Sequence, residues 1–586
     1  MTVSPQVASD LLLFQILCPL LGSAFAMIAS ARRRSSIVLL THLLLLLTGA
    51  LLCIHVYSDR VGGGTGVIEV SWKLLSASKP VVLEQIVLHA DLLNAGILLL
   101  LPLASLTAWG VTGGQSWGSL ETATGQKSAP FRNLLLVSSL LLALAGADLG
   151  TCLTGIFVSA LLITSLMWDR GGEERRFTTK TFLTVQWIGG LALMGGLALL
   201  IATSSLIQSA PRRVPGPSSA VFPQLGEILQ KAITRHESAQ ELWQDARGLP
   251  VLMILAAVFV MSGCFPMHGW MTMALERSSL AVRIWLIVWV KGITLLGIRF
   301  LTLLDPSAMQ DLQGWGITMS MFGLLYSGGL WLSSKRLSGI LGAAVLWSQS
   351  LTLLCVSCTT TDFERLVVPL VLGHLASLIL LAIVLSLVSG GRDSALLSEV
   401  SGIARTSAWI GPSLGVCLAT LTLTPSSQGA SLAWIALVTL PQWSWMGSLA
   451  SWGLLLFANL LALGGGVRLI TRLFRTPNHV GQSPEKTTAP AQASSEIPVP
   501  TPRLRLGPIL LIFSWATIAM GFSFLYFEFL RLPAPVDSLS HHDLSPCRID
   551  LVSNCPFPTE CPRFHDTDVT SNLMRIWISV GSQTRS

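Results

Sequence analysis

The chain has 586 residues, of which 51% are hydrophobic and only 11% are charged, and its mean hydropathy is +0.66. Soluble globular domains carry about 25% charged residues, so this composition excludes a soluble protein and indicates one that crosses a membrane many times. The net charge of +7 is explained by basic loops between the apolar spans, and it does not indicate nucleic-acid binding.

Apolar runs of about 20 residues recur along the chain, and each is long enough to cross the hydrocarbon core as a helix. The pattern predicts an all-α polytopic membrane protein with about fourteen transmembrane helices. The expected spans are 8–30, 36–58, 90–110, 132–147, 149–168, 181–204, 249–268, 281–302, 315–331, 337–358, 366–389, 407–439, 446–467 and 507–530.

Two of these spans contain a proline that predicts a broken helix. Pro266 interrupts the span 249–268, and Pro425 interrupts 407–439, which is too long for one straight crossing. Broken helices are tolerated in a membrane where the freed backbone lines a polar cavity. One interruption in each half of the chain suggests the internal repeats that many transporters contain.

The loops between the spans indicate the topology. Arginine and lysine collect in alternate loops, beginning with Arg32, Arg33 and Arg34, and cytoplasmic loops are enriched in these residues. We therefore expect a multi-pass protein of a bacterial inner membrane with both termini outside the cytoplasm. No cleavable signal peptide is evident, because the first span lacks a basic leader and is not followed by a small-residue cleavage site.

The expected domain organisation follows the spans and the polar segments. A polar loop at 205–247 becomes amphipathic from Gln224 and suggests a surface helix, and a segment rich in Pro, Ser, Thr and Ala is typical of a disordered linker. The divisions are N-terminal helices at 1–110, a first repeat at 111–302, a second repeat at 303–475, the linker at 476–506, a C-terminal helix at 507–532 and a polar extracytoplasmic tail at 533–586.

Cysteines give little indication of chemistry. Most of the ten sit singly in apolar spans, as small buried side chains do. The tail holds Cys547, Cys555 and Cys561 near His541, His542 and His565, so a disulfide or a metal site is conceivable there. Because the spacing fits no zinc pattern, no metal site is predicted.

Lys291 is the most informative ionisable residue. It lies in the middle of the span 281–302, where a lysine costs about 2.5–3.5 kcal/mol to insert, so it is expected to face a protein interior or a water-filled path. With His268 and His374 it offers groups whose protonation can change, as a proton relay requires. His374 is equally consistent with a packed histidine that donates to a backbone carbonyl.

Other charged residues lie near span ends. For Asp148, Arg299, Lys335 and Arg336 we expect the side chains to reach the membrane interface, which explains them without a function. The chain shows no dinucleotide fingerprint and no phosphate loop, and no closely spaced cysteine set for an iron–sulfur cluster. No catalytic residue and no redox cofactor are therefore expected in this chain.

Several segments resemble one known family. Residues 265–270, FPMHGW, followed by Lys291 and Arg299, resemble the core P-x-H-x-W-L-P…K-x-G-x-Y-x-x-x-R of the antiporter-like subunits of respiratory NADH:quinone oxidoreductase (complex I) and of related multisubunit sodium/proton antiporters. The segments 180–186, 333–339, 373–374 and 400–405 agree with further family segments in order. The similarity covers about residues 90–475 and is closest to the subunit M type.

The resemblance implies fourteen helices in two inverted five-helix repeats, with broken seventh and twelfth helices. It implies a proton path along the membrane midplane, in which Lys291 is the central lysine and His374 leads to the second half-channel, with His268, Lys180 and Lys335 as further ionisable groups. It also implies other membrane-arm subunits of a complex I-like assembly as partners, with protons or sodium as the ion.

Three departures from the family bear on pumping. No acidic residue lies between Asp148 and Asp169, where the fifth helix should supply a glutamate, and Met261 stands where the seventh helix should supply a lysine. From Thr406 to Val467 there is no Asp, Glu, Lys, Arg or His, so the twelfth helix lacks its charge. These losses suggest degenerate pumping. They leave open a non-conducting structural subunit, or a subunit of a cation/proton antiporter or of an inorganic-carbon uptake system.

Overall fold

The structure is a computed structural model, and all the residues that it describes belong to one compact unit, Met1–Leu532. The described residues are 5–61, 67–73, 85–113, 129–168, 173–209, 248–303, 306–358, 363–389, 395–400, 402, 409–422, 448–475 and 512–520. The expected surface helix after Gln224, the linker, the tail and Pro425 lie outside these residues.

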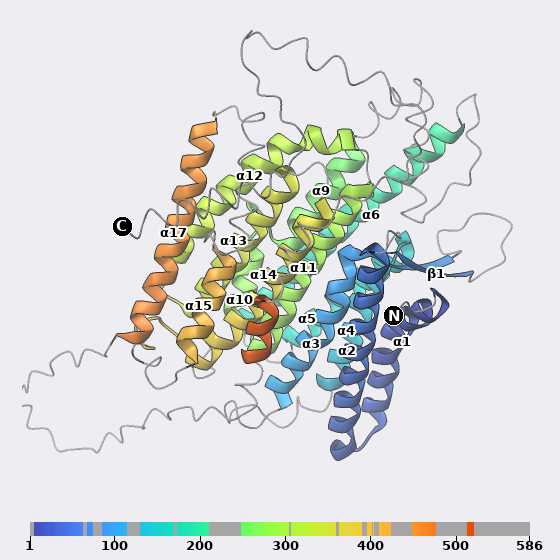
Figure 1. Cartoon of the computed structure of the whole chain (residues 1–586), viewed down its shortest axis with the longest axis horizontal. Coiled ribbons are helices and arrows are strands. Elements are labelled where there is room, and N and C mark those ends of the chain that lie inside the picture. The colour runs from blue at the N-terminus through green and yellow to red at the C-terminus, as the bar shows by residue number, and fades with distance from the viewer. Residues whose placement is uncertain are drawn as a thin grey trace, which may run out of the picture. The chain divides into compact units, whose positions relative to one another are not determined.

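Helices make up most of the described chain (Figure 1). In order they are α1 (Pro5–Ile28), α2 (Ala31–Val61), α3 (Leu92–Gly113), α4 (Ala129–Ala145), α5 (Leu149–Trp168), α6 (Glu173–Ser209), α9 (Gly248–Ser262), α10 (Gly269–Arg277), α11 (Leu280–Leu303), α12 (Pro306–Ser333), α13 (Leu337–Cys358), α14 (Phe363–Val388), α15 (Ile410–Leu421) and α17 (Ser448–Phe474), with a further helix at 512–520.

Eight of the described helices are long and apolar enough to cross a membrane, and four shorter apolar helices accompany them. The expectation of a polytopic helical membrane protein is therefore confirmed. Each of the expected spans overlaps a described helix. Several helices differ in length from the expected spans: α6 and α12 are longer, with 37 and 28 residues, and α9 ends earlier, at Ser262.

One small element is not helical. Strands β1 (Ile68–Lys73) and β2 (Gln85–Ala90) pair antiparallel, with Ile68 opposite Ala90. The hairpin is fixed to the turn between α4 and α5, where Ala147 N donates to Val87 O at 2.8 Å. Short strands between two hydrophobic spans leave no helical or long apolar signal, so the hairpin was not expected from the sequence.

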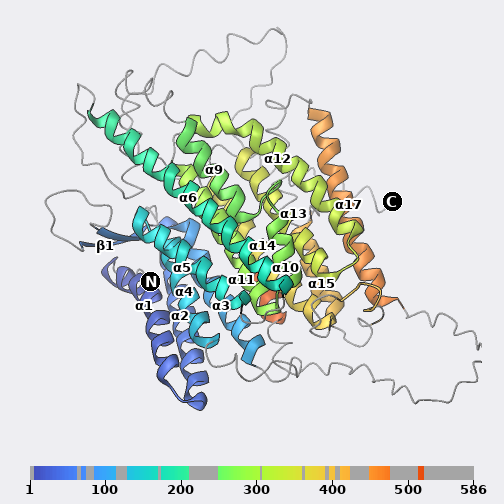
Figure 2. The ribbon, with the colours of Figure 1, turned by 180° about the vertical axis from the view of Figure 1, so that it is seen from behind.

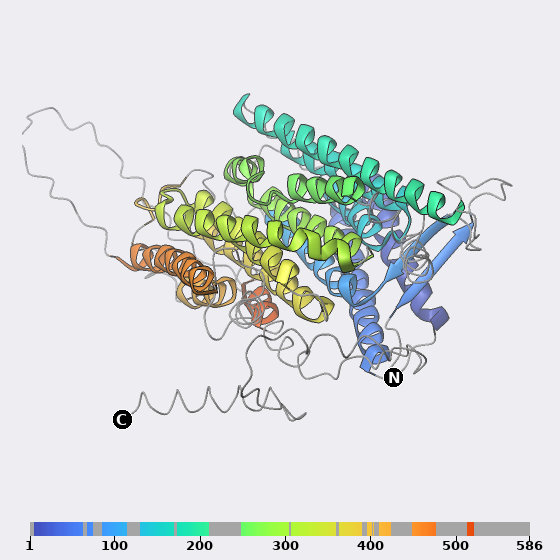
Figure 3. The same cartoon turned by 90° about the horizontal axis from the view of Figure 1, so that it is seen from above.

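The helices differ in how much surface they bury. All residues of the apolar window of α11 and 94% of that of α14 are buried, whereas the windows of α6 and α17 are only 39% buried. Helix α11 contacts α3, α9 and α14, and Figures 2 and 3 show the helices packed side by side, seen from behind and from above. Helices α11 and α14 therefore form the interior of the protein. Helices α6 and α17 each keep an exposed apolar face, which is suited to contact with lipid, and lie at the outer surface.

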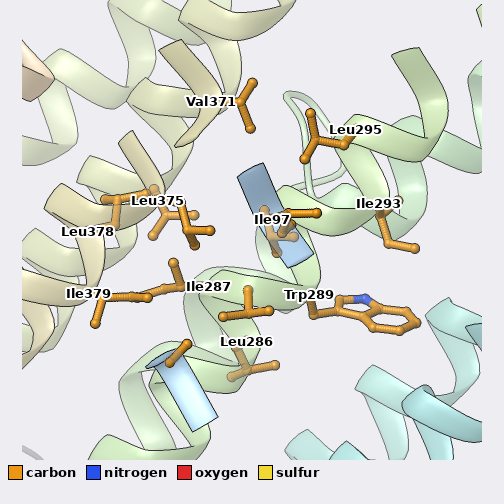
Figure 4. Close-up of a cluster of buried hydrophobic side chains, with 14 of the residues drawn as sticks. Ile97, Leu286, Ile287, Trp289, Ile293, Leu295, Val371, Leu375, Leu378 and Ile379 are labelled. Carbon is orange, nitrogen blue, oxygen red and sulfur yellow. The ribbon is translucent and has the colours of Figure 1, made fainter. Parts of the chain in front are cut away.

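The interior around α11 is apolar on the side of α14 and α3. Figure 4 shows Ile287 of α11 directed toward Leu375 and Ile379 of α14, with Ile97 of α3 beside them. These four side chains are fully buried. A polar side chain on α11 therefore has to find its partners on the remaining faces of the helix.

The break between α9 and α10 is built by a glycine and a proline. Gly263 has φ +65°, and Cys264 N donates to Phe259 O at 3.1 Å. This is the hydrogen bond of a helix that ends on a left-handed glycine. Pro266 follows within the turn, and α10 begins at Gly269. The break leaves backbone carbonyls of α9 without helical partners.

Gly263→Ala tests the glycine at this break. We expect it to lower the free energy of unfolding by about 1–2 kcal/mol, because an L-residue is strained at positive φ and the new Cβ would lie 2.9 Å from Met271 Cβ. Thermal unfolding of the purified protein, followed by tryptophan fluorescence, measures this change. Gly269→Ala is the control, because nothing lies within 4 Å of its Cβ position. Equal melting temperatures of the two variants would contradict the argument.

Two charged residues at helix ends are buried, which corrects the expectation that they reach the interface. Asp148 accepts from Thr151 N at 2.8 Å, as a helix N-cap does, and from Val87 N at 3.0 Å. Arg299 donates to Leu144 O at 2.9 Å and is only 5% exposed. Backbone groups freed at the ends of α4 and α5 supply partners inside the protein, so neither side chain needs the interface. Lys335 and Arg336 are exposed, as expected.

Candidate functional site: a buried lysine between three helices

Lys291 is completely buried in the middle of α11. The nearby residues Val290 and Ile293 are buried as well. An ammonium group with no access to water requires close polar partners. The site is therefore defined by the groups that this lysine reaches.

Helix α13 supplies both partners. Lys291 Nζ donates to Ser348 Oγ at 2.6 Å and to Gln349 Oε1 at 2.9 Å. Both partner groups are neutral, and the ion pairs found among the described residues do not include Lys291. The lysine is thus held by hydrogen bonds and not by an ion pair.

Gln349 connects the lysine to the helix break. Its Nε2 donates to Thr294 Oγ1 at 2.7 Å and lies 3.3 Å from Ser262 O. Ser262 is the last residue of α9, so its carbonyl is one of those freed by the break. One amide side chain therefore joins the broken helix, α11 and α13 around Lys291.

His374 of α14 continues the polar contacts. Its Nδ1 lies 2.8 Å from Ser348 Oγ, so Ser348 bridges the lysine and the histidine. The buried Nε2 has no hydrogen-bond partner among the described residues, and the ring lies near the backbone of Thr420, close to the end of α15. A histidine paired on one side and open on the other can accept a proton at one nitrogen and release one from the other.

Uncharged groups occupy the places where the family resemblance implies charges. Met261 is 1% exposed, and its carbonyl lies 3.4 Å from Gln186 Nε2, while Gln186 Oε1 accepts from Trp289 Nε1 at 3.2 Å. In α5, Ser159 bonds Ser139 of α4 at 2.9 Å. Hydroxyls and amides can pass a proton through hydrogen bonds, but they do not store one as a carboxylate does.

The other expected path residues lie apart from this site. Lys180 is exposed on α6, and Lys335 is exposed in the turn between α12 and α13. His268 is half-buried in the break, where its ring lies 4.7 Å from that of Tyr326 and stacks on Phe265. None of the three has a hydrogen bond to Lys291, Ser348 or His374 in the described structure.

Ser348 is the central residue that the sequence reasoning missed. A usable signal existed, because Ser348, Gln349 and Ser350 form a polar run inside the apolar span 337–358. Serine is common in membrane helices, where it bonds to its own backbone, so the run alone did not distinguish a bridging hydroxyl from an ordinary one.

Comparison with known proteins shows the fold. No protein-family model matches the chain, and no curated protein sequence matches it. Solved structures do match. A chain of the membrane-bound sulfane sulfur reductase, an archaeal respiratory membrane complex, is 15% identical with a TM-score of 0.68, covering 89% of this chain and 96% of that one.

Two further structures are similar over the same extent. A chain of the Mrp complex from Dietzia sp. DQ12-45-1b is 16% identical with a TM-score of 0.65, covering 90% of this chain and 98% of that one. A chain of respiratory complex I from Thermus thermophilus is 15% identical with a TM-score of 0.65, covering 89% and 99%. At these identities the likeness concerns the fold, which is thus shared with chains of three multisubunit membrane complexes.

Proposed function

We propose that this chain is an antiporter-like membrane-arm subunit of a respiratory complex of the NADH:quinone oxidoreductase type, and that it contributes to proton translocation. The observation that carries the proposal is the buried chain of Lys291, Ser348 and His374 on three helices. The fold that it shares with chains of complex I and the Mrp complex supports the assembly. In this proposal the redox chemistry belongs to partner subunits.

The relay proceeds through existing hydrogen bonds. A protonated Lys291 gives a proton to Ser348 Oγ while the Ser348 hydroxyl proton passes to His374 Nδ1. The lysine becomes a neutral amine and His374 an imidazolium, so one charge moves from α11 to α14. Release of the Nε2 proton toward α15 returns His374 to the neutral form. The first step breaks an N–H bond of Lys291 and the O–H bond of Ser348 and makes a new O–H bond on Ser348 and an N–H bond on His374, and the second step breaks the Nε2–H bond of His374.

The charged residues that are missing from the fifth, seventh and twelfth helices limit how efficiently proton transfer along this path is coupled to the redox reaction. Without a carboxylate paired with Lys291 in the described part of the chain, no neighbouring negative charge drives the lysine between its protonation states. We therefore propose degenerate pumping, with two inverted repeats and the cytoplasmic positive loops retained as scaffold. The same observation favours a second candidate, a non-conducting structural subunit of such a complex, because a buried lysine with two hydrogen bonds to α13 also serves to join helices.

Ser348→Ala tests the relay. We expect the rate of proton translocation by the reconstituted complex to fall at least about tenfold, because the hydroxyl is the only link between Lys291 and His374 in the described structure and one lost positioned proton carrier typically costs about 10²–10⁴ in rate. Ser350→Ala is the matched control, since Ser350 is buried on the same helix and takes no part in these contacts. Equal rates for both variants would favour the structural subunit.

The assembly is tested separately. Affinity purification of the tagged chain from mild-detergent membranes, followed by mass spectrometry, is expected to recover quinone-module and other membrane-arm subunits. Recovery of antiporter subunits, or of a carbon-handling partner alone, would replace the respiratory assignment.

A further inference from the structure

A pocket lies apart from the lysine site, at the ends of several helices. It is small and partly open, and it is formed by the end of α5, the start of α6 and the turn between α10 and α11. Its lining residues are Leu166, Met167, Arg175, Thr178, Thr179, Arg277, Ser278, Ser279 and Val282. This set combines two cations, four hydroxyls and three apolar side chains.

The cations come from two elements that meet at the pocket. Arg175 lies in the first turn of α6, and Arg277 ends α10. Arg277 Nη1 donates to Glu174 O at 3.3 Å, and its Nε lies 4.0 Å from Glu174 Oε2. Because the Glu174 side chain is 82% exposed, this long ion pair is weak and leaves guanidinium donors for an anion in the pocket.

Two hydroxyl groups in the turn between α10 and α11 have no hydrogen-bond partner in the described structure. Ser278 is only 6% exposed, makes no hydrogen bond there and lines the pocket. Ser279 Oγ is buried and likewise without a partner. By contrast, Thr178 and Thr179 donate to carbonyls of their own helix at 2.9 Å and 2.8 Å. A buried hydroxyl without a hydrogen bond costs free energy, so a ligand oxygen in the pocket would stabilise the turn.

The start of α11 adds positive potential to the same place. Ser279 O accepts from Arg283 N at 2.8 Å, which makes Ser279 the residue before the first helical turn. The free N–H groups and the dipole of this 24-residue helix favour an anion. The pocket therefore joins two guanidinium groups, unpaired hydroxyls and a helix N-terminus.

The apolar wall indicates the kind of anion. Leu166, Met167 and Val282 line one side of the pocket. Trp168, which ends α5, is 46% exposed and lies beneath Arg176, whose Cζ is 5.8 Å from the ring centroid. An exposed tryptophan with an arginine at the end of a transmembrane helix marks the membrane interface. A ligand here places its polar part near the arginines and an alkyl chain beside the wall.

We propose that the pocket binds the phosphate headgroup of an anionic glycerophospholipid. The guanidinium groups of Arg175 and Arg277 donate to the phosphate oxygens, the Ser278 hydroxyl donates a further hydrogen bond, and the acyl chain lies along Leu166 and Met167. The bound lipid would then hold the turn that leads from the helix break into α11. This binding is independent of whether the chain conducts protons.

Lipid titration with native mass spectrometry tests the site. Delipidated protein in mild detergent is titrated with phosphatidylglycerol, phosphatidylcholine or inorganic phosphate, for the wild type and for Arg277→Gln, Ser278→Ala and the control Arg472→Gln. Arg472 is an exposed cation at the end of α17, outside the pocket. Phosphatidylglycerol is expected to bind the wild type and the control equally, and Arg277→Gln about tenfold more weakly, because charge-assisted hydrogen bonds are lost.

Ser278→Ala keeps the positive charge of the pocket and is expected to weaken phosphatidylglycerol binding less than Arg277→Gln. This difference between the two variants separates recognition of the headgroup from a general loss of structure. The proposal is overturned if phosphatidylcholine binds as tightly as phosphatidylglycerol, if both pocket variants bind like the control, or if inorganic phosphate displaces the lipid completely. None of these results bears on proton translocation, which is measured by the Ser348 variant.

Discussion

Lys291→Met is expected to abolish proton translocation through this chain. Methionine has a similar length and fits a site with no exposed surface, but it can neither carry a proton nor donate to Ser348 and Gln349. The relay then has no group that changes charge on α11. Proteoliposomes with the purified complex and a trapped pH indicator measure the effect, with the redox activity of the complex followed in parallel.

The same variant separates function from stability. Removing Lys291 leaves Gln349 Oε1 without this donor, which costs about 1–3 kcal/mol, but it also removes a buried cation with no ion-pair partner among the described residues, and replacing such a group with an apolar one is often neutral. We expect the melting temperature to change little. Arg472→Met, at an exposed position near the end of α17 and outside the expected path, serves as the control that keeps full translocation. Undiminished translocation by Lys291→Met would exclude the relay.

Gly155→Leu is expected to prevent stable packing of α4 on α5. A Cβ at residue 155 would lie 2.3 Å from Ala143 N and 2.6 Å from its Cα, and backbone atoms cannot move aside as a flexible side chain can. Overpacking of a tight interior costs about 1–3 kcal/mol and sometimes more, and here the two helices must separate. Close approach through small residues is a general means of joining membrane helices.

The effect should appear as loss of folded protein. Yield after size-exclusion chromatography and the thermal unfolding temperature are the measurements, and both are expected to fall strongly for Gly155→Leu. Gly453→Leu is the control in α17, where nothing lies within 4 Å of the added Cβ and the new side chain meets open space. Similar yields for the two variants would show that the contact between α4 and α5 is not needed for folding.

The fold was largely predictable because lipid imposes a simple rule on the chain. Every crossing must be a helix of about 20 apolar residues, and this pattern located α5 and α13 at their observed bounds. The break after Ser262 followed from Pro266, although the glycine that ends α9 was not anticipated. The hairpin of β1 and β2 was missed because it lies between spans, where hydrophobicity carries no signal.

Within the candidate site, the sequence predicted most clearly Lys291, the residue with the highest free-energy cost of insertion into a membrane. Lys291 stood out because a lysine at the middle of a span must be explained. Its contacts could not be read from the chain, because Ser348 and His374 are 57 and 83 residues away from Lys291 in sequence and meet it only through packing of α13 and α14. The buried positions of Asp148 and Arg299 escaped for the same reason, since Val87 N of β2 and Leu144 O of α4 meet them only when the chain is folded.

The helix at 512–520 has a consequence for how the protein is made. Trp515 is fully buried, and its Nε1 donates to Thr107 Oγ1 of α3 at 3.0 Å across 408 residues of sequence. A ribosome that adds 5–20 residues per second takes about 20 to 80 s to cover that length. During this interval the face of α3 around Thr107 is already in the membrane and must be covered by lipid or by an insertion factor until its own partner emerges.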